Sequence, residues 1–175
     1  SFLFIPLFRK LSEKIGKPKV LMISMMIVVL AVTTTWWTFT PDNPWIMLAN
    51  TAFIGAGYAG LWLMIPSMQI DVVDYDELKT GERREGSFAS IFSWVLKFSF
   101  VIGFMISGPL IELTGFDANL DGAQPEEVYT TMRIGFLVIP IVALTIAILL
   151  LRTFPITAEK AAEIRLQLEE KRGKV

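Results

Sequence analysis

Long apolar stretches separated by short charged patches dominate this chain. A helix that crosses the apolar core of a bilayer takes about 20 residues, and several stretches are long enough. The predicted spans are residues 20–37, 45–70, 88–113 and 132–151. They lack the alternation of period two that marks membrane strands, and helices are the other structure that pairs every backbone group within lipid. The pattern therefore predicts an all-α membrane protein.

The segments outside the spans are predicted to be short. Residues 1–8 are apolar but too few to cross a bilayer, so they are predicted to be the end of a truncated transmembrane helix. A basic loop is expected over residues 9–19 and a tail helix over residues 152–175. Ile164 and Leu168 share one face of that tail helix, which leaves two alternatives open, a solvated tail or a helix that binds a partner.

Lysine and arginine gather on one side of the predicted spans. They precede the first span, separate the second from the third, and follow the fourth. The residues are Arg9, Lys10, Lys14, Lys17 and Lys19, then Lys79, Arg83 and Arg84, then Arg152, Lys160, Arg165, Lys171, Arg172 and Lys174. The opposite connections, residues 38–44 and 114–131, contain acids but no Lys or Arg. The positive-inside rule therefore predicts a cytoplasmic C-terminus, in a protein of a bacterial inner membrane.

Composition narrows the functions that this sequence can support. Hydrophobic residues make up 53% of the chain, the formal net charge is −1, and cysteine and histidine are absent. Thiolate and imidazole metal sites are therefore excluded, and the commonest general base is missing. No global charge favours nucleic acid. We expect neither an enzyme nor a nucleic-acid-binding protein, and no cofactor or metal site in this chain.

Lys97 is the most distinctive single residue. It follows the start of the third span by nine residues, which places it roughly 14 Å along a helix. A cation at the centre of a bilayer costs about 3 kcal/mol or more unless it faces a cavity or an acid. Two interpretations stay open: a functional lysine that lines a polar path, or a structural lysine that extends toward the membrane surface.

Aromatic residues lie on one face of the second span. Tyr58 and Trp62 are four residues apart, so they are neighbours on a helix. Aromatic rings in a membrane cavity can stack on a sugar, and ordinary packing is the alternative.

The same span contains the pattern Gly-Ala-Gly-Tyr-Ala-Gly at residues 55–60, which matches the glycine spacing of a dinucleotide-binding loop. That loop requires a preceding strand, so we reject a nucleotide site. Ala52, Ala56 and Gly60 instead predict close packing of helices.

The charged segment between the second and third spans is a candidate gating loop on the basic side. Its acids include Asp71, Asp74 and Glu77, and its bases include Arg83 and Arg84. Because arginines compete for the carboxylates, interdomain salt bridges or gating are expected here rather than a metal site.

This segment also carries a resemblance to a known family. The motif Asp71-Val-Val-Asp-Tyr-Asp-Glu-Leu-Lys79, which includes Tyr75, is followed by Arg84-Glu-Gly-Ser87 and a span with Lys97. The series resembles the glycoside–pentoside–hexuronide cation symporters of the major facilitator superfamily, which include the melibiose carriers. Residues 14–19 and 154–157 are also similar to members of this family, so the resemblance covers essentially the whole chain.

The resemblance implies a fold and a function. The chain would be the C-terminal portion of a transporter, with the end of helix 8 and helices 9–12 of the C-terminal six-helix bundle. The whole protein would move a sugar or related solute together with Na⁺ or H⁺ by alternating access. The cation ligands would lie mostly in the N-terminal half. The implied partners are the solute, membrane lipid and that N-terminal bundle.

Individual residues also match the family pattern. Lys97 matches the lysine of helix 11 near the sugar and cation sites, and Trp62 falls where melibiose carriers have a tryptophan. Ile65 and Pro66 depart from the more polar sequence of those carriers, so melibiose is not implied as the solute. The alternatives are a lysolipid or other major facilitator carrier, and a membrane scaffold without transport activity.

Overall fold

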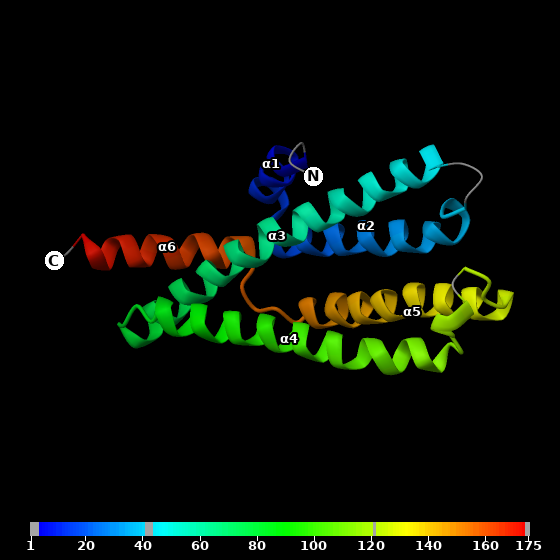
Figure 1. Ribbon diagram of the computed structural model, residues 1–175. Coiled ribbons are helices and arrows are strands. Elements are labelled where there is room, and N and C mark those ends of the chain that lie inside the picture. Colours follow the sequence, from blue (N-terminus) through cyan, green and yellow to red (C-terminus); the bar gives the residue numbers. More distant parts are fainter. Residues whose placement is uncertain (1–3, 41–43, 121, 174–175) are drawn as a thin grey trace.

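The computed structural model describes residues 4–40, 44–120 and 122–173, and this part of the chain folds into helices without strands. The helices are α1 (Ile5–Ile15), α2 (Lys17–Thr38), α3 (Pro44–Thr80), α4 (Glu85–Leu113), the short 3₁₀ helix η2 (Ala118–Leu120), α5 (Glu126–Leu151) and α6 (Ala158–Arg172). Figure 1 shows α2, α4 and α5 running in nearly the same direction, α3 at a slant to them, and α6 projecting beyond the bundle. Helices α2, α3, α4 and α5 are long and apolar enough to cross a membrane. The predicted all-α membrane fold is confirmed.

The structure corrects the expected loop at residues 9–19. Residues 9–15 continue α1, and α2 begins at Lys17, so Gly16 alone separates the two helices. Gly16 has a φ of +89°, a conformation that ends a helix and that glycine adopts without strain. Pro18 then lies in the first turn of α2, where its missing N–H leaves no helical bond unmade.

The predicted gating loop is also shorter than expected. Residues 71–80 form the last turns of α3, and the connection to α4 is limited to residues 81–84. No glycine or proline interrupts residues 71–80, so the helix continues until Gly81, whose φ is +76°. The carboxylates of this segment therefore have fixed positions on a helix.

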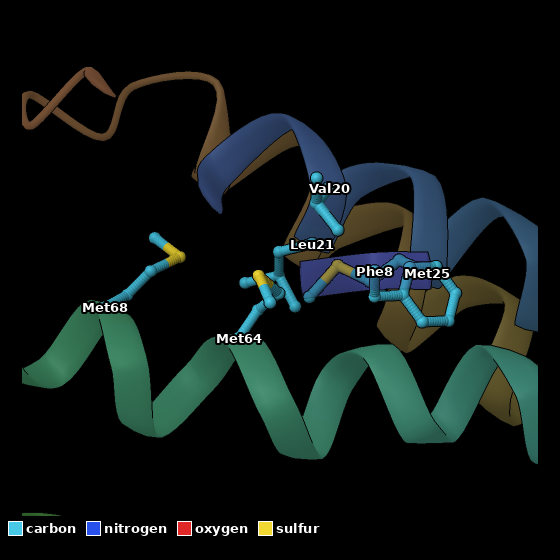
Figure 2. Packing of buried hydrophobic residues seen from close by; sticks show 6 residues of the cluster. All are labelled: Phe8, Val20, Leu21, Met25, Met64 and Met68. Atoms are coloured by element: carbon cyan, nitrogen blue, oxygen red, sulfur yellow. The ribbon is translucent and has the colours of Figure 1, made fainter. Parts of the chain in front are cut away.

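The largest buried cluster joins α1, α2 and α3 at the basic end of the molecule. It consists of Phe8, Val20, Leu21, Met25, Met64 and Met68. Figure 2 shows the two methionines of α3 reaching toward the α2 side chains, with the Phe8 ring beside them. The flexible thioethers fill the space between helices that cross at an angle. This cluster fixes the helix that carries Tyr58 and Trp62.

Two glycines allow α2 and α3 to approach closely. A Cβ atom on Gly60 would overlap the Ser24 hydroxyl and lie 2.7 Å from the Ser24 Cβ. A Cβ atom on Gly57 would lie 2.5 Å from the Val28 Cγ2. The prediction of close packing holds for Ala56 and Gly60, which are buried, but it is wrong for Ala52, which is exposed. Gly57 takes its place at the interface because the helices cross near it.

We predict that Gly60→Ala destabilises the protein by about 1–3 kcal/mol, the usual cost of forcing extra volume into a packed interface. Gly55→Ala is the matched control because no atom lies within 4 Å of its added Cβ. In that variant we expect a small gain, since alanine favours the helix by about 0.5–1 kcal/mol. The thermal unfolding midpoint in detergent checks both. Equal unfolding midpoints for the two variants would contradict close packing of α2 and α3 at Gly60.

A polar network holds α2 and α3 together at the opposite end. The buried Asn50 side chain donates hydrogen bonds to the Ala31 carbonyl (3.2 Å) and the Thr38 hydroxyl (3.0 Å). Its own oxygen accepts a bond of 2.9 Å from the Thr34 hydroxyl. Every polar atom of this amide that faces α2 is therefore paired, as a polar group in an apolar environment requires.

Arg133 of α5 forms hydrogen bonds with the C-terminal end of α2. Its guanidinium donates to the backbone carbonyls of Trp36 at 2.6 Å and Phe39 at 3.3 Å. Its central carbon also lies 5.0 Å from the Trp36 ring centroid. The last carbonyls of a helix have no partner within the helix and carry partial negative charge, so a cation there is stabilising.

In contrast, α4 packs loosely against the rest of the described chain. None of its residues, 85–113, is buried. Large apolar side chains point outward over most of its length, including Phe104 and Leu113, whose exposed fractions are 79% and 80%. A helix that is apolar on all sides is typical of a lipid or protein interior. Helix α4, which carries Lys97, therefore exposes apolar surface that lipid or another part of the protein would cover.

Candidate functional site

Lys97 lies on a polar strip of α4. Ser93 and Ser90 are four and seven residues before it, so the three side chains share one helix face. Together with Ala89 and Trp94 they line an open depression of about 430 Å³. Trp94 is stacked on Phe98, with ring centroids 5.1 Å apart. The strip offers one cation and two hydroxyls beside an aromatic wall.

No salt bridge within residues 4–40, 44–120 and 122–173 includes Lys97. Of the two serines on this strip, Ser90 donates its hydroxyl to the Gly86 carbonyl at 2.8 Å. The ammonium group of Lys97 is exposed, in a helix of high hydropathy. The described chain thus presents an uncompensated charge along an otherwise apolar span.

A second depression lies beside this strip, at the charged end of α4. It has a volume of about 230 Å³ and is lined by Pro66, Gln69, Ile70, Val73, Arg83, Glu85 and Ala89. Ala89 lines both depressions. Polar groups therefore follow one face of α4 from Arg83 and Glu85 to Lys97.

Tyr58 and Trp62 occupy different surroundings. Tyr58 lines an apolar groove of about 680 Å³ formed by α2, α3, α4 and α5, with Ile54, Phe136 and Pro140 among its neighbours. Trp62 is 62% exposed and does not line that groove. No residue lines both the Tyr58 groove and the Lys97 depression. Among the described residues, Lys97 and Tyr58 thus line separate depressions, and Trp62 lines neither of them.

Asp71 is the centre of the ionic cluster at the basic end. Its side chain is only 6% exposed, and it accepts from Lys17 Nζ and Arg165 Nη2, each at 2.7 Å. Lys17 also donates to the Ser67 carbonyl at 2.9 Å. One buried carboxylate therefore joins the start of α2, the end of α3 and the tail helix α6.

The other predicted acids pair with arginines. Arg83 contacts Asp74 at 3.1 Å and Glu77 at 2.9 Å. Hydrogen bonds with Glu77, Glu85 and Asp74 raise the pKa of the Arg83 guanidinium above its ordinary value, so it stays charged. Glu77 also accepts from Arg172 at 2.8 Å. These salt bridges all join residues of this chain, and the expected bridges to another domain stay a prediction.

Arg84 forms a separate pair near the surface. It donates to both carboxylate oxygens of Asp76, at 2.9 and 2.6 Å. This bidentate contact with Asp76 raises the pKa of Arg84 above its ordinary value.

One face of the tail helix packs against α3, while most residues of α6 are exposed. Ile156, Ile164 and Leu168 are buried against Val72, Tyr75, Leu78, Phe154 and Ala161. The Thr157 side chain caps α6 by accepting from the backbone N–H of Lys160. Lys171 donates to the Leu78 carbonyl at 3.2 Å. Helix α6 therefore packs on the last turns of α3 and is joined to them by hydrogen bonds.

Several residues of these sites were not predicted from the sequence. They are Lys17, Asp76, Ser90, Ser93, Arg165 and Arg172. The serines had a usable signal, because they repeat on the Lys97 face at helical spacing. Nothing in the sequence pointed to Arg165 and Arg172 of α6 as partners of Asp71 and Glu77, because a pairing across more than 90 positions depends on how the helices pack.

These features define a class of protein. Long apolar helices, a cation within one of them that forms no salt bridge with the described residues, and an ionic cluster at one end are typical of a polytopic membrane protein that handles a polar solute. The chain belongs to the MFS/sugar transport protein family, whose model matches residues 1–158. The resemblance to the glycoside–pentoside–hexuronide symporters is thereby confirmed.

Curated relatives agree with this assignment. The chain is 31% identical over 137 residues to an uncharacterized symporter of Synechocystis, an alignment covering 76% of this chain and 25% of the relative. It is 32% identical over 112 residues to a putative glycoside/cation symporter of Escherichia coli, covering 64% and 23%. A glucuronide carrier protein homolog of Escherichia coli is 25% identical over 167 residues, covering 95% and 36%. The chain thus spans about a quarter to a third of the length of these relatives.

Proposed function

We propose that the full-length protein is a secondary transporter that couples movement of a sugar or related small solute to a Na⁺ or H⁺ gradient. This chain would supply the end of helix 8 and helices 9–12 of its C-terminal bundle. Family membership and the named symporters among its relatives support this proposal. In this scheme the basic end faces the cytoplasm, as the distribution of Lys and Arg indicates.

The observation that carries the proposal is Lys97 on its serine strip. A charge held in an apolar span is retained where it meets water, a solute or a counter-charge. The ammonium group has no acid partner within the described residues, and a second depression, which shares Ala89 with the first, lies toward Arg83 and Glu85. Lys97 is therefore positioned to contact a solute or a carboxylate that arrives from outside this chain.

The ionic cluster suggests how the basic end of the molecule contributes to alternating access. Alternating access requires two arrangements of the bundles that differ by only a few kcal/mol. Arg83 contacts three carboxylates while 40% of its side chain is exposed. Such exposed pairs are individually weak and can exchange partners. We propose that Arg83 and Arg84 exchange partners as the bundles move, while Asp71 keeps the tail helix in place.

The test is solute uptake into membrane vesicles that contain the full-length protein. A panel of radiolabelled neutral glycosides, glucuronides and pentosides is offered with an imposed Na⁺ gradient, with a H⁺ gradient, and with neither. We expect at least one solute to accumulate above equilibrium with one gradient, and an ionophore that collapses the gradient to abolish accumulation. Uptake that never exceeds equilibrium for any solute would reject coupled transport. No binding or uptake of any panel member would favour the scaffold alternative.

A further inference from the structure

Two lysines from different helices converge on the ring of Tyr75. The Lys79 ammonium lies 4.4 Å from the ring centroid and the Lys160 ammonium lies 5.5 Å from it. Lys79 reaches the ring because it follows Tyr75 by one helical turn on α3. Lys160 reaches it because α6 packs on α3 through Ile164, Leu168 and their neighbours. The apolar contact between α6 and α3 thus holds Lys79 and Lys160 on the same side of the molecule, next to the Tyr75 ring.

These lysines differ from the basic residues around them. Lys17, Arg83, Arg84, Arg165 and Arg172 each contact a carboxylate. Within the described residues, no carboxylate oxygen lies within the 4.0 Å salt-bridge distance of Lys79 or Lys160. The acids of α3 nearby are already paired with arginine. The ammonium groups beside Tyr75 therefore keep N–H donors that no carboxylate of the described residues occupies.

The position along α3 fits the surface of a bilayer. The uncharged part of α3 ends at Ile70, and Tyr75 follows five residues later, which is roughly 8 Å along the helix axis. The interfacial layer of a bilayer extends about 5–8 Å beyond each side of the hydrocarbon core. Tyrosine and long basic side chains favour this layer, with the ring or stem near the apolar region and the polar end in water.

We propose that Tyr75, Lys79 and Lys160 bind the headgroup phosphate of an anionic phospholipid. Two ammonium groups and a phenol hydroxyl can all donate to phosphate oxygens, and the negative charge compensates the lysine pair. Because Lys79 belongs to α3 and Lys160 to α6, a bound lipid would bridge the two helices. The site is separate from Lys97 and does not depend on which solute is carried.

The test measures lipid binding to the full-length purified protein. The protein is titrated with phosphatidylglycerol or with zwitterionic phosphatidylcholine, and native mass spectrometry detects the bound lipid. We expect one phosphatidylglycerol to bind more tightly than phosphatidylcholine. In the variant K79Q/K160Q its dissociation constant should rise roughly thirtyfold, since each lysine at a membrane surface contributes roughly a fivefold factor. The variant K10Q/K14Q is the control, because it removes two exposed lysines of α1 that form no salt bridge with any described residue. It should change the constant less than twofold.

Two results would overturn the site. Equal weakening in the test and control variants would show that the protein attracts anionic lipid only through its overall surface charge. Displacement of the lipid by millimolar inorganic phosphate or glycerol 3-phosphate would show that a soluble phosphate is the occupant. Size-exclusion profiles identical to the parent protein confirm that each variant is folded. The binding readout needs no transport, so failure of the proposed symport leaves this test intact.

Discussion

Lys97→Ala is expected to abolish gradient-driven uptake by the full-length protein, lowering the initial rate at least tenfold. If Lys97 contacts the solute or a counter-charge within the membrane, its removal deletes a charge-assisted hydrogen bond. Such a bond contributes about 1.5–3 kcal/mol, and each 1.4 kcal/mol is a factor of ten in an equilibrium constant. Initial rates in vesicles, normalised to the amount of protein in the membrane, measure the effect.

Lys19→Ala is the matched control for that experiment. Lys19 is another exposed lysine of a membrane-length helix, but it lies in the first turn of α2. We expect it to leave the uptake rate within twofold of the parent protein. A third variant, Lys97→Arg, keeps the charge while changing its shape and hydrogen-bond geometry, so partial activity there would indicate that charge is the main requirement. Full uptake by Lys97→Ala would instead make Lys97 a structural lysine that extends to the membrane surface.

The sequence predicted Lys97 because the cost of a charge in lipid does not depend on tertiary structure. Its depth follows from helix rise alone, and no neighbouring residue has to be known. Each predicted span likewise lies within one helix, since hydropathy reflects the bilayer. The sequence alone could not show whether Lys97, Tyr58 and Trp62 line one cavity. The structure places Lys97 and Tyr58 in separate depressions, on helices that contact each other little.

The charged segments were less predictable than the apolar ones. Residues 71–80 have the polarity of a loop, and the sequence analysis treated them as one. They are helical because Val72, Tyr75 and Leu78 pack against α6 and because Arg83 and Arg84 neutralise the acids. Both causes depend on residues distant along the chain or after the helix end. Local composition therefore placed the end of α3 about ten residues too early.

The double substitution K17M/R165M is expected to destabilise the protein by about 3–5 kcal/mol, the usual cost of leaving a buried charge without its partner. Asp71 would keep its carboxylate in a site that is only 6% exposed while losing both cations that lie 2.7 Å away. The methionine side chains preserve much of the apolar stem of lysine and arginine. The thermal unfolding midpoint in detergent, with the Trp fluorescence of the full-length protein as the signal, measures the loss.

A third substitution separates charge from packing. Adding Asp71→Asn to K17M/R165M removes the stranded charge, and an ion pair replaced by neutral residues is often close to neutral in stability. The triple variant should therefore recover most of the lost midpoint. Arg84→Met is the control for loss of an arginine, and because that side chain is 47% exposed we expect about 0–1 kcal/mol. If the triple variant is no more stable than the double, the two cations act through packing, and Asp71 is not the residue that links α2 and α6 to α3.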